Sequence, residues 1–217
     1  MRTVIYTAIE NCAAAVLQEP MIVMGSALLV SRRAWLGIMA ASALRRDADA
    51  DDALAVLIGL VGERLRLMRA VAESKWNSGA PIEDEAREES LIAGVVALAP
   101  SYGLDPRQAA AFFRAQIEAA KCIESALITR WAAARAAPFD APPDLQTVIR
   151  PQLDRLTPAL LAALAAAVPR LRRGGAEQIA AASQQDDPVM AVAMARALQP
   201  LLELAGARAV APTTIHP

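Results

Sequence analysis

The chain has 217 residues, of which 21% are charged and 4% are aromatic, and its net charge is −1. This balance excludes the basic footprint of a nucleic-acid-binding protein, and the length suits one domain preceded by a leader. Alanine is abundant and runs of β-branched residues are scarce, which favours helices over strands. The single histidine, His216, lies in the tail and the two cysteines, Cys12 and Cys122, lie far apart. We therefore expect neither a metal site nor an internal disulfide.

Residues 1–46 have the pattern of a leader. Arg32 and Arg33 precede the apolar stretch Leu36–Leu44, which contains the small-x-small cleavage pattern Ala41–Ala43. This arrangement resembles a twin-arginine export signal. The alternatives are an ordinary amphipathic helix and an uncleaved anchor, but the apolar runs are interrupted and shorter than the ~20 residues that span a bilayer. We therefore predict that the mature protein is not inserted in a membrane.

Beyond the leader, the hydrophobic spacing predicts one all-α domain over residues 47–206, a bundle of about six helices. Asp105, which is followed by proline, and Asp144 are expected helix starts, because aspartate caps helices and proline suits the first turn. Pro151 and Pro158 are expected to break or kink the helix that contains them. The expected helices cover about 51–76, 84–99, 106–137, 144–171, 176–184 and 188–205, with a loose tail at 207–217.

Two cations fall on the apolar face of the first of these helices. Arg64 and Lys75 are eleven residues apart, and three helical turns take ~10.8 residues, so both side chains point the same way. Charged residues are rarely buried unless they are paired. Their companions at helical spacing are Leu57, Leu60, Val61, Leu67, Met68 and Val71.

Two further helices also bring charge to an inward face. Arg87 shares a face with Asp84, and Glu124 shares one with Gln116 and several large apolar residues. Two interpretations follow from this pattern. The charges could form buried ion pairs that hold the core together, for example Arg64–Glu124, or they could surround an anionic ligand.

A resemblance bears on this choice. The K-W, P-I-E-D and R motifs between Lys75 and Arg87 are followed by the F-F-x-x-Q-I-x-A-x-K-x-I-E helix over Phe112–Glu124. Together with Arg64, this combination resembles the all-helical, type II chorismate mutases, and most closely their exported subgroup. The resemblance covers about residues 53–164.

The resemblance implies an isomerase that converts chorismate to prephenate in phenylalanine and tyrosine biosynthesis, without cofactor or metal. It implies a periplasmic or secreted protein whose partner is a small-molecule substrate, and it is compatible with a homodimer. The main alternative is a non-catalytic helical module that retains the fold for binding or sensing. A membrane-anchored structural protein is a third class.

The resemblance also assigns roles to the charged residues. Arg64 and Arg87 would clamp the carboxylates of chorismate, since guanidinium offers a planar, bidentate fork. Lys75 would donate to the ether oxygen, and Glu124 would face it from the other side, where only its protonated form can help. Asp84 would accept a hydrogen bond from the ring hydroxyl.

Two more predicted substrate-binding residues have a structural alternative. Glu88 follows the arginine of the motif and could instead be a surface acid. Gln116 could orient the ligand or brace the core.

The chain departs from the family pattern at two positions. Ala120 stands where a serine or threonine is frequent, and it cannot donate a hydrogen bond. Ala159 aligns with a further arginine of the exported subgroup. We predict Arg155 as its substitute in substrate binding, with Arg150 as a weaker candidate.

Overall fold

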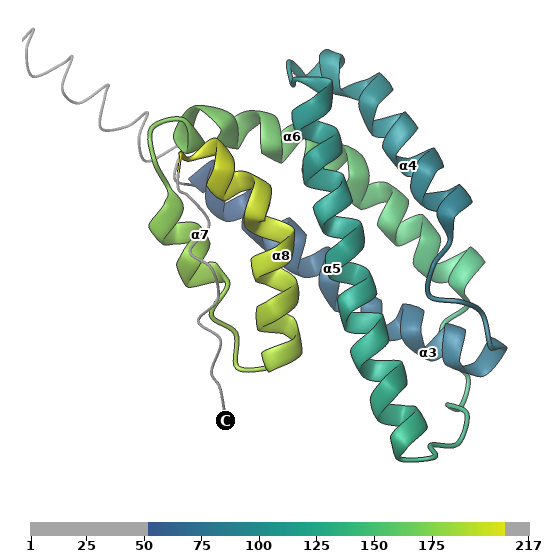
Figure 1. Ribbon diagram of the computed structural model, residues 1–217. Coiled ribbons are helices and arrows are strands. Elements are labelled where there is room, and N and C mark those ends of the chain that lie inside the picture. Colours follow the sequence, from purple (N-terminus) through teal and green to yellow (C-terminus); the bar gives the residue numbers. More distant parts are fainter. Residues whose placement is uncertain (1–51, 207–217) are drawn as a thin grey trace, which may run out of the picture. The chain divides into compact units, whose positions relative to one another are not determined.

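The computed structural model describes residues 52–206, and within this range every regular element is a helix (Figure 1). The predicted all-α class is therefore confirmed. None of the described helices is long and apolar enough to cross a membrane. The leader predicted at 1–46 and the tail predicted at 207–217 lie outside the described residues, so they stay predictions, as do the domain bounds.

The first predicted helix forms over its expected length but is interrupted. Residues 52–66 are helical, Leu67 forms a turn, and α3 (Met68–Ser78) continues the chain. The Leu67 amide donates to the Arg64 carbonyl at 3.2 Å. The two residues are three positions apart, which is the spacing of a 3₁₀ turn and not the four-residue spacing of an α-helix. Gly79 ends α3 in the left-handed conformation, with φ of 67°, which glycine adopts without a steric penalty.

Two well-capped helices follow. α4 (Glu85–Leu98) begins after Asp84, whose carboxylate accepts from the Arg87 amide, and it is followed by the 3₁₀ turn η1 (Ala99–Tyr102). α5 (Pro106–Ala133) begins after Asp105, whose carboxylate accepts from two backbone amides. α5 ends four residues before the predicted position, since Arg135 adopts a positive φ of 50° and the helix cannot continue through it.

The C-terminal half contains an irregular turn before Pro151 and Pro158, the prolines at which we predicted a break or kink, and the helix is continuous through both of them. A wide π-helical turn, η2 (Leu145–Ile149), begins after the Asp144 cap and leads into α6 (Arg150–Leu171). α6 passes through Pro158, whose missing amide cannot bond to the carbonyl four residues earlier. The last helices are α7 (Ala176–Ala182) and α8 (Pro188–Leu204).

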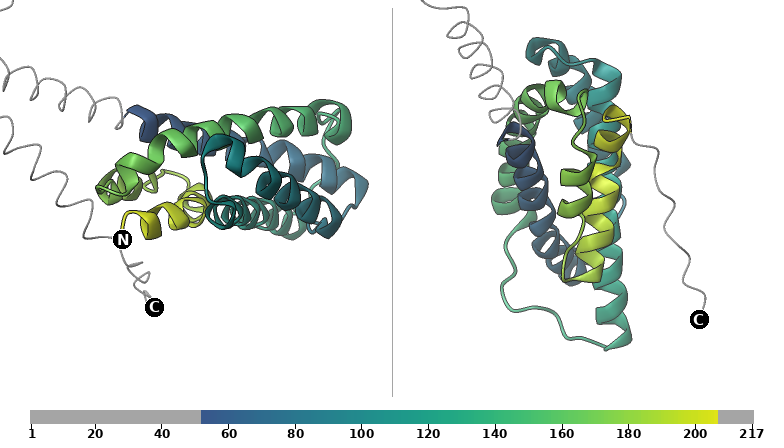
Figure 2. Two further views of the ribbon diagram at one scale, coloured as in Figure 1. Left: turned by 90° about the horizontal axis from the view of Figure 1, so that it is seen from above. Right: turned by 90° about the vertical axis from the view of Figure 1, so that its left-hand side faces the viewer.

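If residues 52–78 count as one interrupted helix, the described part contains six α-helices, as predicted. α8 lies beside α5, while the helix over residues 52–78 and α6 cross behind this pair (Figures 1 and 2). The core between them is made almost entirely of leucine, alanine, isoleucine, methionine and phenylalanine, with Phe112 and Phe113 on α5 among its largest members. Within residues 52–206, only three polar side chains are buried with it: Arg64, Gln116 and Glu124.

Candidate active site

A pocket with a cavity volume of about 120 Å³ lies between α3, α4, α5 and the start of α6. Apolar side chains form part of its wall, but its charged lining is unusually dense. The charged residues are Arg64, Lys75, Arg87, Lys121 and Arg150, together with Asp84, Glu88, Glu124 and Asp154. Two of the three polar residues that are buried in the described part of the chain, Arg64 and Glu124, therefore face this pocket.

A lysine and a glutamate from different helices meet on one side of the pocket. Lys75 Nζ on α3 lies 2.8 Å from Glu124 Oε2 on α5, and it also donates to the Ile82 carbonyl at 2.6 Å. The side chains of Lys75 and Glu124 are 11% and 6% exposed. An ammonium group has three N–H donors, so one donor of Lys75 is left for a ligand in the pocket.

The environment of Glu124 favours its neutral form. Burial raises the pKa of this carboxyl, and the hydrogen bond and charge of Lys75 oppose the shift without cancelling it. Desolvation destabilises the carboxylate, which is the form that water would otherwise solvate. Glu124 can therefore be protonated nearer to neutral pH than an ordinary glutamate.

Arg64 is a buried cation without a carboxylate of its own. Its side chain lies at the pocket, it is 6% exposed, and its Nε has no hydrogen-bond partner within the described part of the chain. Burial, followed by the like charge of Arg87, lowers the pKa of Arg64 to about 10, while Asp154 opposes this shift. Arg64 thus stays charged at neutral pH, and an anion in the pocket would supply the missing partner.

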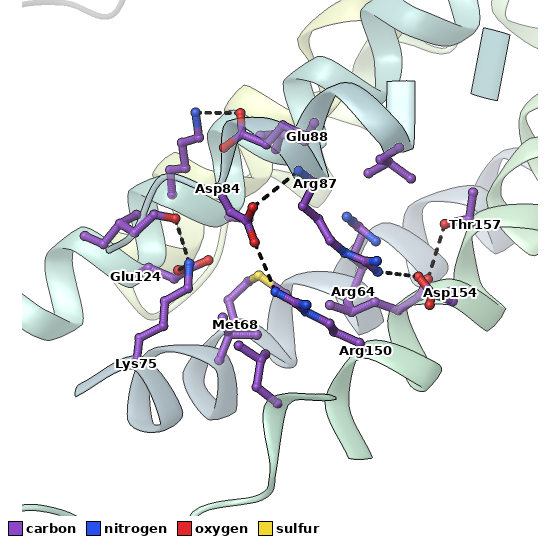
Figure 3. Close-up of a pocket in the computed structure, with 18 residues that line it drawn as sticks. Arg64, Met68, Lys75, Asp84, Arg87, Glu88, Glu124, Arg150, Asp154 and Thr157 are labelled. Carbon is purple, nitrogen blue, oxygen red and sulfur yellow. Dashed lines mark hydrogen bonds and ion pairs between the residues drawn. The ribbon is translucent and has the colours of Figure 1, made fainter. Parts of the chain in front are cut away.

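Two more arginines lie at the rim, each paired with an aspartate. Arg87 Nη2 is 2.6 Å from Asp154 Oδ1, and Arg150 Nη2 is 3.0 Å from Asp84 Oδ2. Figure 3 shows Lys75 and Glu124 on one side of the pocket and the three arginines on the other, with Asp84 between them. The arrangement suits a small molecule with two carboxylates at one end and a polar atom at the other.

The comparisons with known proteins agree with this geometry. A family model described as chorismate mutase type II matches residues 44–125. A crystal structure of chorismate mutase from Burkholderia thailandensis is 38% identical, with a TM-score of 0.63, over 69% of this chain and 98% of that one. The chain belongs to the chorismate mutase family.

Two further chorismate mutases extend the comparison. The crystal structure from Burkholderia phymatum is 31% identical, with a TM-score of 0.65, and the match covers 70% of this chain and 97% of that one. A protein of Mycolicibacterium smegmatis named secreted chorismate mutase is 37% identical over 100 residues, 45% of this chain and 55% of that protein. The chain therefore spans about half the length of this curated relative.

The pocket brings together six of the eight predicted site residues. The interpretation as buried ion pairs holds in part, since Glu124 is in a buried ion pair, but with Lys75 and not with Arg64; the interpretation as a site for an anionic ligand stays a prediction. Glu88 lines the pocket while pairing with Lys121 at 2.8 Å. The six are Arg64, Lys75, Asp84, Arg87, Glu88 and Glu124.

The structure does not bring Gln116 or Arg155 to the pocket. Gln116 is buried and donates through Nε2 to the Ala197 carbonyl at 2.9 Å, so it joins α5 to α8. Arg155 is exposed and donates through Nε to the Pro151 carbonyl of its own helix. For Gln116 the reason is that α8 covers this part of α5. For Arg155 it is the π-helical turn before α6, which changes the direction in which the following residues point.

Arg150 takes the place that we predicted for Arg155, and the pocket also contains Asp154 and Thr157, which the sequence reasoning missed. These three residues stand at i, i+4 and i+7, which places them on one face of α6. That spacing is the signal that could have identified them. Ala120 also lines the pocket, so the departure from serine or threonine removes a donor from the site itself.

The buried charge of Arg64 leads to a stability prediction. Arg64→Met should raise the free energy of unfolding by about 1–3 kcal/mol, because the variant fills the same space without an unpaired buried charge. Urea unfolding followed by circular dichroism measures this difference. Arg66→Met, at an exposed position of the same helix, is the matched control and should change stability by less than about 0.5 kcal/mol. A lower free energy of unfolding for Arg64→Met would show that the folded protein already supplies partners to the Arg64 guanidinium.

Proposed function

We propose that this protein is an active chorismate mutase that converts chorismate to prephenate. Its membership in the family makes this the first candidate activity. The observation that carries the proposal is the buried, unpartnered Arg64 guanidinium, which faces the same pocket as the Lys75–Glu124 pair. A buried cation without a partner is costly, and binding of an anionic substrate accounts for its presence.

The reaction is a [3,3] rearrangement within one molecule. The ether C–O bond breaks while a new C–C bond forms, so that no atom is gained or lost and no group passes to the protein. The protein has two tasks: to hold the dicarboxylate in its compact reactive shape, and to stabilise the negative charge that develops on the ether oxygen.

Arg64, Arg87 and Arg150 are the proposed partners of the substrate carboxylates. Arg64 has a buried guanidinium that is free to donate, whereas Arg87 and Arg150 already have aspartate partners at the rim. Guanidinium can bind a carboxylate through two parallel hydrogen bonds. Three arginines on one side of the pocket therefore give a dicarboxylate one preferred orientation.

Lys75 and Glu124 are the proposed donors to the ether oxygen. The third N–H of Lys75 is available for it, since the other two are used by Glu124 and the Ile82 carbonyl. Glu124 can donate only when protonated, and burial raises its pKa in that direction. A bound dianion would raise this pKa further, because like charge disfavours the carboxylate.

Glu88 and Asp84 are proposed in weaker roles. Asp84 caps α4 and pairs with Arg150. In its proposed role, the Asp84 carboxylate also accepts a hydrogen bond from the ring hydroxyl of chorismate. Glu88 pairs with Lys121, so its contribution is to position that lysine at the edge of the pocket.

We also infer export of this chain, because it resembles a relative named as secreted and carries the Arg32-Arg33 pattern. The proposed route is the twin-arginine pathway, with the mature protein in the periplasm or outside the cell. Assembly as a homodimer stays a prediction, which light scattering of the purified protein can test.

The function is tested by turnover of chorismate. The purified protein should consume chorismate and form prephenate equally well with and without a chelator. Lys75→Ala should lower kcat by about 10²- to 10³-fold, because it removes a donor to the developing charge, while its circular dichroism spectrum stays unchanged. A loss below tenfold would mean that Lys75 is structural. Chorismate binding without turnover by the wild-type protein would instead favour the non-catalytic binding module.

The pKa of Glu124 leads to a pH prediction. Because the neutral carboxyl is the working form, kcat/KM should fall as the pH rises through the raised pKa of Glu124. Glutamine has nearly the same shape, donates a hydrogen bond and does not titrate. Glu124→Gln should therefore retain activity and flatten the alkaline side of the pH–rate profile, whereas Glu124→Ala should lose activity throughout. An unchanged profile in Glu124→Gln would assign the titration to another group.

The export proposal is tested separately from catalysis. Replacing both residues, Arg32→Lys with Arg33→Lys, keeps the positive charge but removes the paired guanidinium groups. The variant should accumulate in the cytoplasm, while its activity in cell extracts stays unchanged. Cell fractionation with an activity assay measures both quantities, and normal export of the double variant would contradict the twin-arginine route.

A further inference from the structure

The carboxylate of Asp154 lies beside the arginines that are proposed to bind the carboxylates of the substrate. It lies on α6 at the rim of the pocket, and its Oδ1 is 2.6 Å from Nη2 of Arg87. It also opposes the lowering of the Arg64 pKa by burial. Asp154 therefore acts on two of the three arginines that the substrate carboxylates are proposed to contact, and Figure 3 shows it beside both.

The charge balance of the pocket points to the same conclusion. Five cationic and four acidic side chains line it, so its net charge is +1 when all of them are ionised. Chorismate carries two negative charges. If one acid withdrew or were neutralised, the net charge would become +2 and would match the dianion. Asp154 and Asp84 are the two acids paired with arginines on the carboxylate side, and Asp154 is the more exposed of them, at 60% against 44%.

The Arg87–Asp154 pair can open at little cost. Its two side chains are 41% and 60% exposed, and ion pairs at this exposure contribute little to stability. By contrast, the Lys75–Glu124 pair is almost fully buried and fixes two helices. Asp154 is thus the pocket acid that a bound anion can displace most easily.

We propose that Asp154 is an affinity-determining residue: in the empty pocket it pairs with Arg87 and lies beside Arg64 without pairing with it, and a dicarboxylate substrate displaces it on binding. This inference rests on the proposed function, because it takes chorismate as the ligand. In the empty site the negative charge of Asp154 offsets the repulsion between the guanidinium groups of Arg87 and Arg64. In the occupied site its charge opposes the substrate, which lowers affinity.

The test replaces Asp154 by asparagine, which keeps the shape but removes the charge. Asp154→Asn should lower the KM for chorismate by about three- to tenfold, since one like charge beside the substrate is lost. The kcat should change by less than twofold, because Asp154 is remote from Lys75 and Glu124 at the ether oxygen. Asp154→Glu restores the charge and should return KM toward the wild-type value.

The matched control is Asp186→Asn, which makes the same charge change at an exposed position between α7 and α8 that does not line the pocket. It should leave KM unchanged. A raised KM in Asp154→Asn would instead make Asp154 a residue that holds Arg87 in place for the substrate, and an unchanged KM would show that it is not displaced. Either result overturns the proposal.

A binding experiment separates this inference from the proposed catalysis. Malate, an unreactive dicarboxylate, should raise the thermal midpoint of Asp154→Asn more than that of the wild-type protein at the same concentration. This result is expected even if the protein does not rearrange chorismate. If malate shifts both proteins equally or neither of them, then Asp154 does not compete with a carboxylate, and the inference is wrong whatever the catalytic activity.

Discussion

A positive charge inside the domain without a carboxylate of its own is the constraint on which the site depends. Arg64 is 6% exposed, and its Nε has no partner among the described residues. Burying such a group is unfavourable, so the rest of the core must stabilise the fold against it. The fully buried leucines and phenylalanines packed between the helices supply that stability. Under the proposed function, this cost in stability is the consequence of a preformed site for an anion.

The other charges are arranged so that they do not satisfy Arg64. Glu124 pairs with Lys75, and Asp84 pairs with Arg150. Each of these contacts has a second use: Lys75 also bonds to the Ile82 carbonyl in the loop before α4, and Asp84 caps that helix. The proposed catalytic side chains therefore also make structural contacts, and these contacts hold the proposed donors to the ether oxygen in place.

The two ends of the pocket differ in how freely they can respond to a ligand. The Lys75–Glu124 end is buried and joins α3 to α5, so it can be preorganised for the charge that develops in the reaction. At the other end, the Arg87–Asp154 pair is exposed and can rearrange. Under the proposed function, a rigid end for chemistry and an adaptable end for carboxylates would allow a pocket with nearly balanced charge to accept a dianion.

From the sequence alone, the fold class and most of the charged residues that line the pocket could be predicted. Composition and spacing predicted the helices, because each helix buries one periodic face and begins at a capping residue. The eleven-residue spacing also placed Arg64 and Lys75 on one face. These features are local, since they depend only on residues within a few turns of each other.

Two features depend on how the helices pack in three dimensions: which charges meet, and which arginine of α6 reaches the pocket. The pairing of Lys75 with Glu124 joins residues 49 positions apart, and periodicity gives the face of each helix but not its partner. Gln116 lies on the Glu124 face, yet it turns to α8 because that helix covers this part of α5. Arg150 replaces Arg155 because the π-helical turn over Leu145–Ile149 resets the direction of the following helix. Such a turn changes every later position by the same rotation, and no residue in its sequence signals it.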